Sequence, residues 1–196
     1  MSDIKSAREI AMEKVERLGE ATEEERLGWK YIPEGEKLAA RYLNRDCNLV
    51  AELDRYNKYA AKYVIQGTSD VLIKNIKLPT NDLARKTNER AMDGLRVLKS
   101  DKEGVEEVLS RIGNIFKHYV EQGEQQRRQA YERLKVEFED RVQQAVQQQL
   151  GLSLKARIDV EKQPQFQEEW RKIQSQLDMQ YLKLLDEYKQ ELRDIP

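Results

Sequence analysis

The residue types that most often carry out chemistry are scarce in this chain. His118 is the only histidine and Cys47 is the only cysteine. A single histidine excludes histidine-rich metal sites and most proton shuttles, and a di-iron bundle needs two histidines, each with a glutamate three residues before it. Cys47 has no histidine near it in the sequence to act as its base. We therefore interpret His118 as a partly buried residue of a helical bundle and Cys47 as a helix-packing residue.

Motifs that bind phosphates or activate a serine are absent as well. The chain has no Gly-x-x-x-x-Gly-Lys-Ser/Thr loop, no Gly-x-Gly-x-x-Gly turn and no Gly-x-Ser-x-Gly elbow. The acidic run Glu23–Glu25 is interpreted as a solvated helix start, because divalent cations need ligands that converge from more than one turn. We accordingly predict no catalytic residue, no cofactor and no metal ion. Carboxylates are abundant, however, so a carboxylate-based enzyme without a recognisable motif is kept as an alternative.

A second alternative rests on residues 77–99, which faintly resemble a helix-turn-helix. The run PTNDLARK from Pro79 is followed by TNERAMDGLRVL, although the glycine that usually begins the turn is missing. The resemblance implies a DNA-binding regulator with four basic side chains at the phosphates: Arg85, Lys86, Arg90 and Arg96. The net charge of the chain is only -1, and neither half is strongly basic, so nucleic acid is not the expected partner.

The elements that must position these residues are predicted to be long helices. Ser100–Leu150 contains no proline, and Ser100 with Glu103 matches a capping box that predicts a helix start near residue 101. Apolar residues recur at steps of three and four as far as Val120, which predicts a wide stripe facing a core. The stripe stops between residues 121 and 129, where we expect any kink, and then resumes more thinly.

A second helical stretch near the end of the chain matches the first. Apolar residues from Gln165 to Arg193 keep steps of three and four for about four heptads. The arms Glu124–Leu150 and Gln165–Arg193 have similar lengths of about 40 Å, so we predict an antiparallel coiled-coil hairpin. The segment Leu152–Val160, which connects the two arms, alternates between apolar and polar residues. It is interpreted as a short β-hairpin or a loop. The predicted interaction seam contains Leu134, Phe138, Val142, Trp170, Ile173, Leu177, Tyr181 and Leu184.

Residues 1–120 are predicted to form a smaller helical body, and residues 121–196 the hairpin, with the option that both pack as one continuous unit. Helices are expected over residues 4–19, over 22–30 behind a capping box at Thr22, and over 48–65. The last of these has two alternatives: it continues to Lys77, or residues 67–70 end one helix and cap the next. Pro33 is placed in the first turn of another helix. Thr80 or Asn81 is expected to cap the helix that follows Pro79.

Composition supports an all-α, elongated helical bundle. Hydrophobic residues make up 39% of the chain and charged residues 36%, which suits long solvated helices better than a compact globule. The balanced charge and helical spacing argue against a disordered chain.

The sequence also indicates where the protein is located and what it does. The charged beginning of the chain lacks the apolar core of a signal peptide, and no stretch reaches the length of a membrane span. With one cysteine, we expect a cytoplasmic protein without disulfides. We interpret it as a non-enzymatic scaffold or adaptor that engages a protein partner, or a second copy of itself, by helix-on-helix burial along the seam.

Overall fold

The computed structural model describes residues 22–44, 47–150 and 159–196, and within these residues it is all-helical, without a strand. The fold class predicted from the sequence is therefore confirmed as all-α. The elements in chain order are α2 (Glu23–Leu43), α3 (Leu49–Leu53), α4 (Lys58–Asn75), α5 (Asp82–Leu98), α6 (Lys102–His118), the π-helical turn η1 (Tyr119–Gly123), α7 (Glu124–Leu150), the 3-10 turn η2 (Val160–Lys162) and α8 (Pro164–Asp194).

The chain divides into two compact units, the first ending at Leu72 and the second beginning at Ile73. The division predicted at residues 120 and 121 falls inside the helical run formed by α6, η1 and α7. The predicted helix over residues 4–19 and most of the Leu152–Val160 segment lie outside the described residues. Val160 itself begins η2.

In the first unit, α2 begins where the sequence predicts a helix. The backbone N–H of Glu25 donates to Thr22 Oγ1 at 3.2 Å, and the N–H of Thr22 donates to Glu25 Oε2 at 2.8 Å, which confirms the capping box. The predicted break before Pro33 is wrong, because α2 runs through this exposed residue to Leu43. Leu38 and Ala39 beyond the proline are completely buried, so their packing offsets the backbone hydrogen bond that proline removes.

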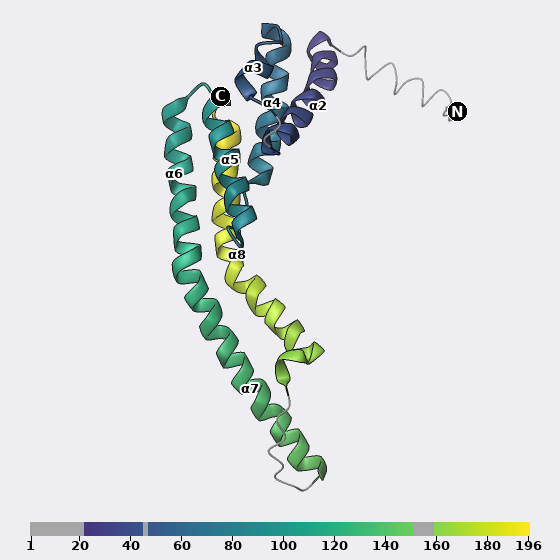
Figure 1. The fold of residues 1–196 in the computed structure, drawn as a ribbon, viewed down its shortest axis with the longest axis vertical. Helices are drawn as coiled ribbons and strands as arrows, with labels where there is room; N and C mark the ends of the chain where they lie inside the picture. The colour runs from purple at the N-terminus through teal and green to yellow at the C-terminus, as the bar shows by residue number, and fades with distance from the viewer. Residues whose placement is uncertain (1–21, 45–46, 151–158) are drawn as a thin grey trace, which may run out of the picture. The chain divides into compact units, whose positions relative to one another are not determined.

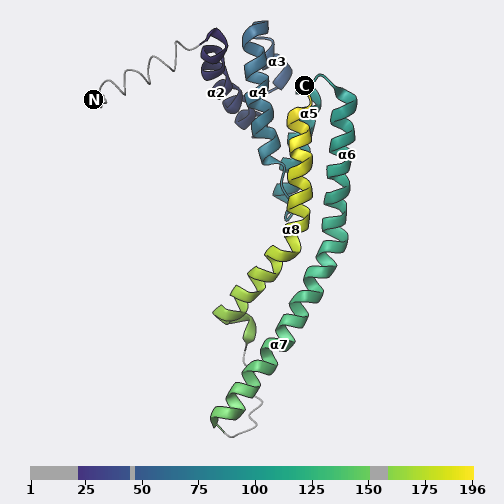
Figure 2. The ribbon, with the colours of Figure 1, turned by 180° about the vertical axis from the view of Figure 1, so that it is seen from behind.

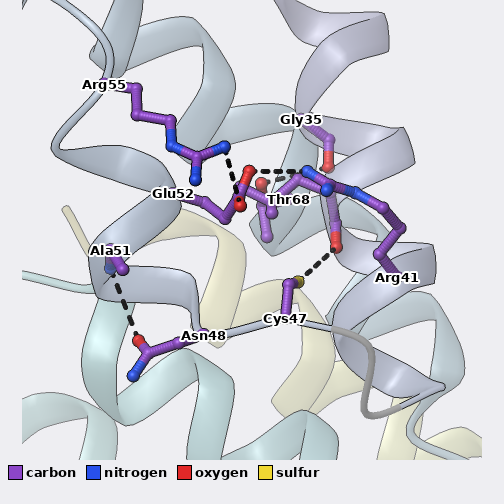
Figure 3. Close-up of polar contacts among 9 residues, drawn as sticks. Gly35, Arg41, Cys47, Asn48, Ala51, Glu52, Arg55 and Thr68 are labelled. Carbon is purple, nitrogen blue, oxygen red and sulfur yellow. Dashed lines mark hydrogen bonds and ion pairs between the residues drawn. The ribbon is translucent and has the colours of Figure 1, made fainter.

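A close crossing of α2 and α4 decides between the two alternatives for residues 67–70. They do not end a helix but lie inside α4, which continues to Asn75, close to the Lys77 of the other alternative. A Cβ at Gly67 would stand 2.2 Å from the carbonyl oxygen of Ile32, and a Cβ at Gly35 would stand 2.2 Å from that of Val64. Thr68 Oγ1 is 3.1 Å from the Gly35 oxygen (Figure 3) and 2.7 Å from the Val64 oxygen. The glycines therefore permit backbone contact between two helices and do not end one of them.

The single helix predicted over residues 48–65 is also wrong, since a turn separates α3 from α4. Asn48 Oδ1 accepts from the N–H of Val50 at 3.0 Å, and Asn57 Oδ1 accepts from that of Ala60 at 2.9 Å. Asparagine side chains that bond nearby amides compete with a continuous helix and start new ones. Glu52 on α3 ties this segment to α2 through an ion pair of 2.7 Å with Arg41 (Figure 3).

In the second unit, α5 and α6 start with side-chain caps. Asn81 Oδ1 accepts from the N–H of Ala84 at 2.8 Å, which confirms one of the two predicted caps. The cap of α6 is Asp101, which accepts from Gly104 N–H at 3.0 Å, and not the predicted Ser100. Ser100 instead donates through its N–H and its hydroxyl to the oxygen of Pro196, at 2.9 and 3.0 Å. The turn between α5 and α6 is therefore fastened to the residues after α8.

The helical run from α6 through η1 to α7 has α8 beside it, running in the opposite direction (Figures 1 and 2). The antiparallel direction follows from the contacts, because Arg111 on α6 pairs with Glu191 whereas Arg141 on α7 pairs with Glu169. The predicted interruption over residues 121–129 overlaps η1 only at residues 121–123, and η1 is a wider turn of five residues that leaves the helix continuous.

Candidate functional site

The eight predicted seam residues fall into two structurally different sets. Leu134 and Phe138 on α7 are buried together with Val160 and Phe166 in one hydrophobic cluster. Val142, Trp170 and Ile173 pack against this cluster, as does Tyr131. We call these eight residues the closed cluster, because they pack against one another. Five of them are predicted seam residues, and together the eight hold α7, η2 and α8 in contact.

The closed cluster is built mainly from edge-to-face aromatic contacts. The ring of Tyr131 lies 5.5 Å from that of Phe166 and 5.0 Å from that of Trp170, measured between centroids. The rings of Phe138 and Phe166 are 5.6 Å apart and nearly perpendicular. Such pairs contribute about 0.5–1.5 kcal/mol each beyond their buried area. In this part of the hairpin, the apolar side chains are thus covered by other residues of the same chain.

The other three predicted residues, Leu177, Tyr181 and Leu184, line an open groove of about 670 Å³ between α8 and the helical run of α6 and α7. Leu184 leaves 43% of its surface exposed. We call this hollow the α6–α8 groove. It is also lined by Arg111, Asn114, Ile115, His118, Gln126, Gln176, Gln180 and Tyr188.

One end of the groove adjoins a polar and aromatic network at the π-helical turn. His118 Nδ1 is 2.9 Å from the hydroxyl of Tyr181, whose ring meets that of Tyr119 edge to face at 5.2 Å. The Arg127 guanidinium lies over the Tyr119 ring at 4.1 Å, donates to the Tyr119 carbonyl at 3.2 Å and pairs with Asp178 at 3.4 Å. Burial raises the pKa of the Tyr119 phenol. The network therefore fixes α8 against the start of α7.

Sequence reasoning did not find Arg127 or Asp178. One local signal for this network was available, the glycine in the polar stretch after Val120. A Cβ at Gly123 would lie only 3.2 Å from the Tyr181 hydroxyl and 3.1 Å from Arg127 Nη1. The absence of a side chain at this position lets both groups approach the wider turn.

The closed cluster and the α6–α8 groove lie within a stretch shared with related sequences. The model of a family of unknown function, DUF6657, matches residues 50–194. The chain belongs to this family. No curated protein and no solved structure matches the chain. The family match extends from α3 almost to the end of α8, so both features belong to the part that defines DUF6657.

In this DUF6657 member, the basic residues of the helix-turn-helix alternative lie on one helix. Residues 82–98 form α5 without a break, so the two helices expected between residues 77 and 99 are not formed there. Asn81 caps this helix and no turn follows it, because Ala91, Leu95 and Leu98 are buried along one continuous face. DNA binding by this stretch stays a prediction.

The four basic side chains predicted to contact phosphates differ in their exposure and in the ion pairs that they form within the chain. Arg96 bonds to Glu106 at 2.7 Å and to Asp93 at 2.8 Å, and the bond to Glu106 raises the pKa of the guanidinium. Arg85 pairs with Asp82 at 3.5 Å, and Lys86 is exposed. Arg90 is half-buried. Two carboxylates already lie at the Arg96 guanidinium, which lowers its availability to a phosphate.

Three further observations concern the parts of this DUF6657 chain that the structure describes. No three histidine, cysteine, aspartate or glutamate side chains gather there as a metal ion would require. No described helix combines the length and apolar character needed to span a bilayer. Cys47 is half-buried, and its thiol faces the Leu38 carbonyl oxygen at 4.0 Å (Figure 3).

Proposed function

We propose that this DUF6657 protein is a non-enzymatic helical scaffold that self-associates through the α6–α8 groove. The observation that carries the proposal is the contrast between the two halves of the predicted seam. The closed cluster is filled within the chain, whereas Leu177 and Leu184, with Ile115, line a groove that remains open. Apolar surface on a helix pair that is left open is the usual place for another helix.

The second half of the proposal is that the two arms form an antiparallel coiled coil. Its support is the spacing of Phe166, Trp170, Ile173, Leu177 and Tyr181, which advances by steps of four, three, four and four. Such steps keep one stripe facing a partner helix over successive turns. The α7 residues Tyr131, Leu134, Phe138 and Val142 advance in the same way. A coiled coil of this kind presents a rigid surface on which a further helix can lie.

The lining of the groove favours a second copy of the chain over an unrelated partner. Four amide side chains line it: Asn114, Gln126, Gln176 and Gln180. An amide both donates and accepts hydrogen bonds, so it matches another amide. In a two-fold dimer the same patch faces itself, which suits self-matching amides and disfavours patches of one charge. Arg111 is already paired with Glu191, and His118 already contacts Tyr181.

Leu184, which lines the groove, leaves 43% of its surface exposed, and a dimer formed through the groove would cover it. Met179 and Leu182 are also exposed, but they lie about 140–160° around α8 from Leu184 and so outside the groove. Fully burying one leucine side chain contributes about 1.5–3 kcal/mol, so the two groove leucines would each favour association.

Sedimentation velocity tests the proposal on the full chain. We expect the wild-type protein to sediment as a dimer, and Leu184→Asp to weaken the dimer at least tenfold, since about 1.4 kcal/mol corresponds to that factor. Val136→Asp is the matched control, because Val136 is 56% exposed and does not line the groove. It should leave the dimer intact. A wild-type monomer at all concentrations, or equal dissociation of both variants, would overturn self-association through this groove.

A further inference from the structure

A second cavity, of about 450 Å³, lies between α5 and the run of α6 and η1. Its α5 lining is Arg85, Asn88, Glu89 and Met92, and its other wall is Gly113, Phe116, Lys117, Val120 and Glu121, with Pro79 at one end. We call it the α5–α6 pocket. At 100° per residue, its α6 residues lie on the face of α6 opposite to the α6–α8 groove. The two sites are therefore distinct.

The size and floor of the pocket suit a small molecule. Met92, Phe116 and Val120 are each partly exposed into it, and Pro79 is buried. Ligand sites are usually hollows of about 300–1,000 Å³ with mostly apolar walls and a few polar groups. An apolar group of moderate size placed here would cover the Phe116 ring and the Met92 side chain.

Gly113 is unexplained by the packing of the chain itself. A Cβ at this position would meet nothing within 4 Å. Glycine inside a helix lowers its stability relative to alanine, and here no close contact between helices requires it. The structural consequence of Gly113 is the open space that it leaves in the wall of the pocket.

The charged lining combines both signs on both walls. The α5 wall contributes Arg85 and Glu89, and the opposite wall contributes Lys117 and Glu121. Among the described residues, no ion pair joins one wall to the other, and Arg85 contacts only Asp82, at 3.5 Å, on its own helix. Asn88 is occupied, because its amide bonds the backbone of Lys77. The pocket lining therefore offers two cations and two carboxylates to a ligand.

We propose that the α5–α6 pocket binds a small zwitterion with an apolar body, such as a free α-amino acid with a large side chain. The ligand carboxylate pairs with Arg85 or Lys117, its ammonium group pairs with Glu89 or Glu121, and its side chain covers Phe116. A ligand with a single charge would satisfy one sign only and would leave the other pair partly desolvated without a partner. This inference does not depend on self-association.

Isothermal titration calorimetry with three phenyl compounds tests the charge requirement. L-phenylalanine carries both charges, 3-phenylpropionate lacks the ammonium group and 2-phenylethylamine lacks the carboxylate. We expect L-phenylalanine to bind with a Kd of roughly 1 mM or tighter, as suits a ligand of this size. Each singly charged compound should bind at least tenfold more weakly. Equal affinities for the three compounds, or no saturable binding of L-phenylalanine, would overturn the proposal.

Variants at Gly113 locate the binding. Gly113→Leu places a good helix former in the open wall, so we expect it to keep the melting temperature and to weaken L-phenylalanine binding at least tenfold. Gly113→Ala is the conservative second variant, because its single methyl group would have no other atom of the chain within 4 Å. Leu184→Asp, which affects only the α6–α8 groove, should leave the affinity unchanged. Unaltered binding by a folded Gly113→Leu protein would contradict the proposed site.

Discussion

His118 Nδ1 and the Tyr181 hydroxyl lie 2.9 Å apart and join the last residue of α6 to the middle of α8. The contact stands beside the π-helical turn, and the Tyr181 ring also meets Tyr119 edge to face. Tyr181→Phe removes the hydroxyl and keeps the ring. We expect it to lower the free energy of unfolding by about 0.5–1.5 kcal/mol, the net value of one hydrogen bond.

A double-mutant cycle with His118→Ala separates this hydrogen bond from ring packing. If the two groups act on each other, the cost of Tyr181→Phe should largely disappear once His118 has been removed. Urea unfolding of the four proteins supplies the free energies. Costs that add within about 0.3 kcal/mol would show that the two residues contribute independently.

Local chemistry made some elements predictable from the sequence, and tertiary contacts decided the rest. The Thr22 capping box and the Asn81 cap depend on residues within one turn, so the sequence alone suffices for them. Gly67 carries the same local signal as a helix end. Its real partner is the Ile32 carbonyl, which is distant in the sequence. Pro33 is tolerated inside α2 for a similar reason, since the residues after it are buried.

The candidate site shows the same limit. Helical spacing placed all eight residues on one seam between the two arms, but it does not distinguish Phe138, which is buried against Phe166, from Leu184, which faces an open groove. Arg127 and Asp178 are separated by 51 residues, and single charges of these common types carry no pattern. Their pairing became visible only once α8 was placed beside α7.

The glycine crossing of α2 and α4 predicts opposite effects for similar substitutions. Gly35→Ala and Gly67→Ala each place a methyl group 2.2 Å from a backbone oxygen. Because backbone has to move, we expect each to lower the free energy of unfolding by about 2–3 kcal/mol. Amide hydrogen exchange in α2 and α4 gives a local measurement, and protection there should fall sharply.

Gly28→Ala is the matched control for this crossing, on the same helix. Its methyl group would find Tyr63 Cε1 at 3.6 Å, an ordinary contact. Alanine favours the helix, so stability should rise by up to about 1 kcal/mol. If all three alanine variants raise stability alike, the two helices do not cross as closely as described.

Asn88 predicts a large cost for a single buried amide. It is 2% exposed, accepts from the Lys77 N–H at 2.9 Å and donates to the Lys77 carbonyl oxygen at 2.6 Å. Asn88→Ala leaves both backbone groups without this partner, so we expect a loss of about 2–3 kcal/mol in urea unfolding. Gln129→Ala, at an exposed position of α7 outside the groove, should change stability by less than about 0.5 kcal/mol. Equal effects would remove the structural role of Asn88.

Two ion pairs beside the closed cluster predict how the hairpin responds to acid. Lys135 pairs with Glu161 at 2.6 Å, and Arg141 pairs with Glu169 at 2.7 Å. Each cation, through its hydrogen bond, holds the pKa of its glutamate below the ordinary value of 4.5. The unfolded chain therefore binds more protons than the folded chain in this range. The stabilisation is fully present above about pH 4.5 and is lost as the pH falls through the lower pKa of the folded state.

Melting temperatures between pH 3 and 8 check this expectation. Wild-type protein should lose stability from these pairs only below about pH 4.5. The double variant Glu161→Gln with Glu169→Gln should melt at a lower temperature at pH 7, by a small amount because both pairs are partly exposed. The gap to wild type should close as the pH falls, since protonation removes the same charges. Glu124→Gln, at an exposed position of α7, is the control and should follow the wild-type curve. A gap that stays constant down to pH 3 would mean that the glutamates act through something other than their charge.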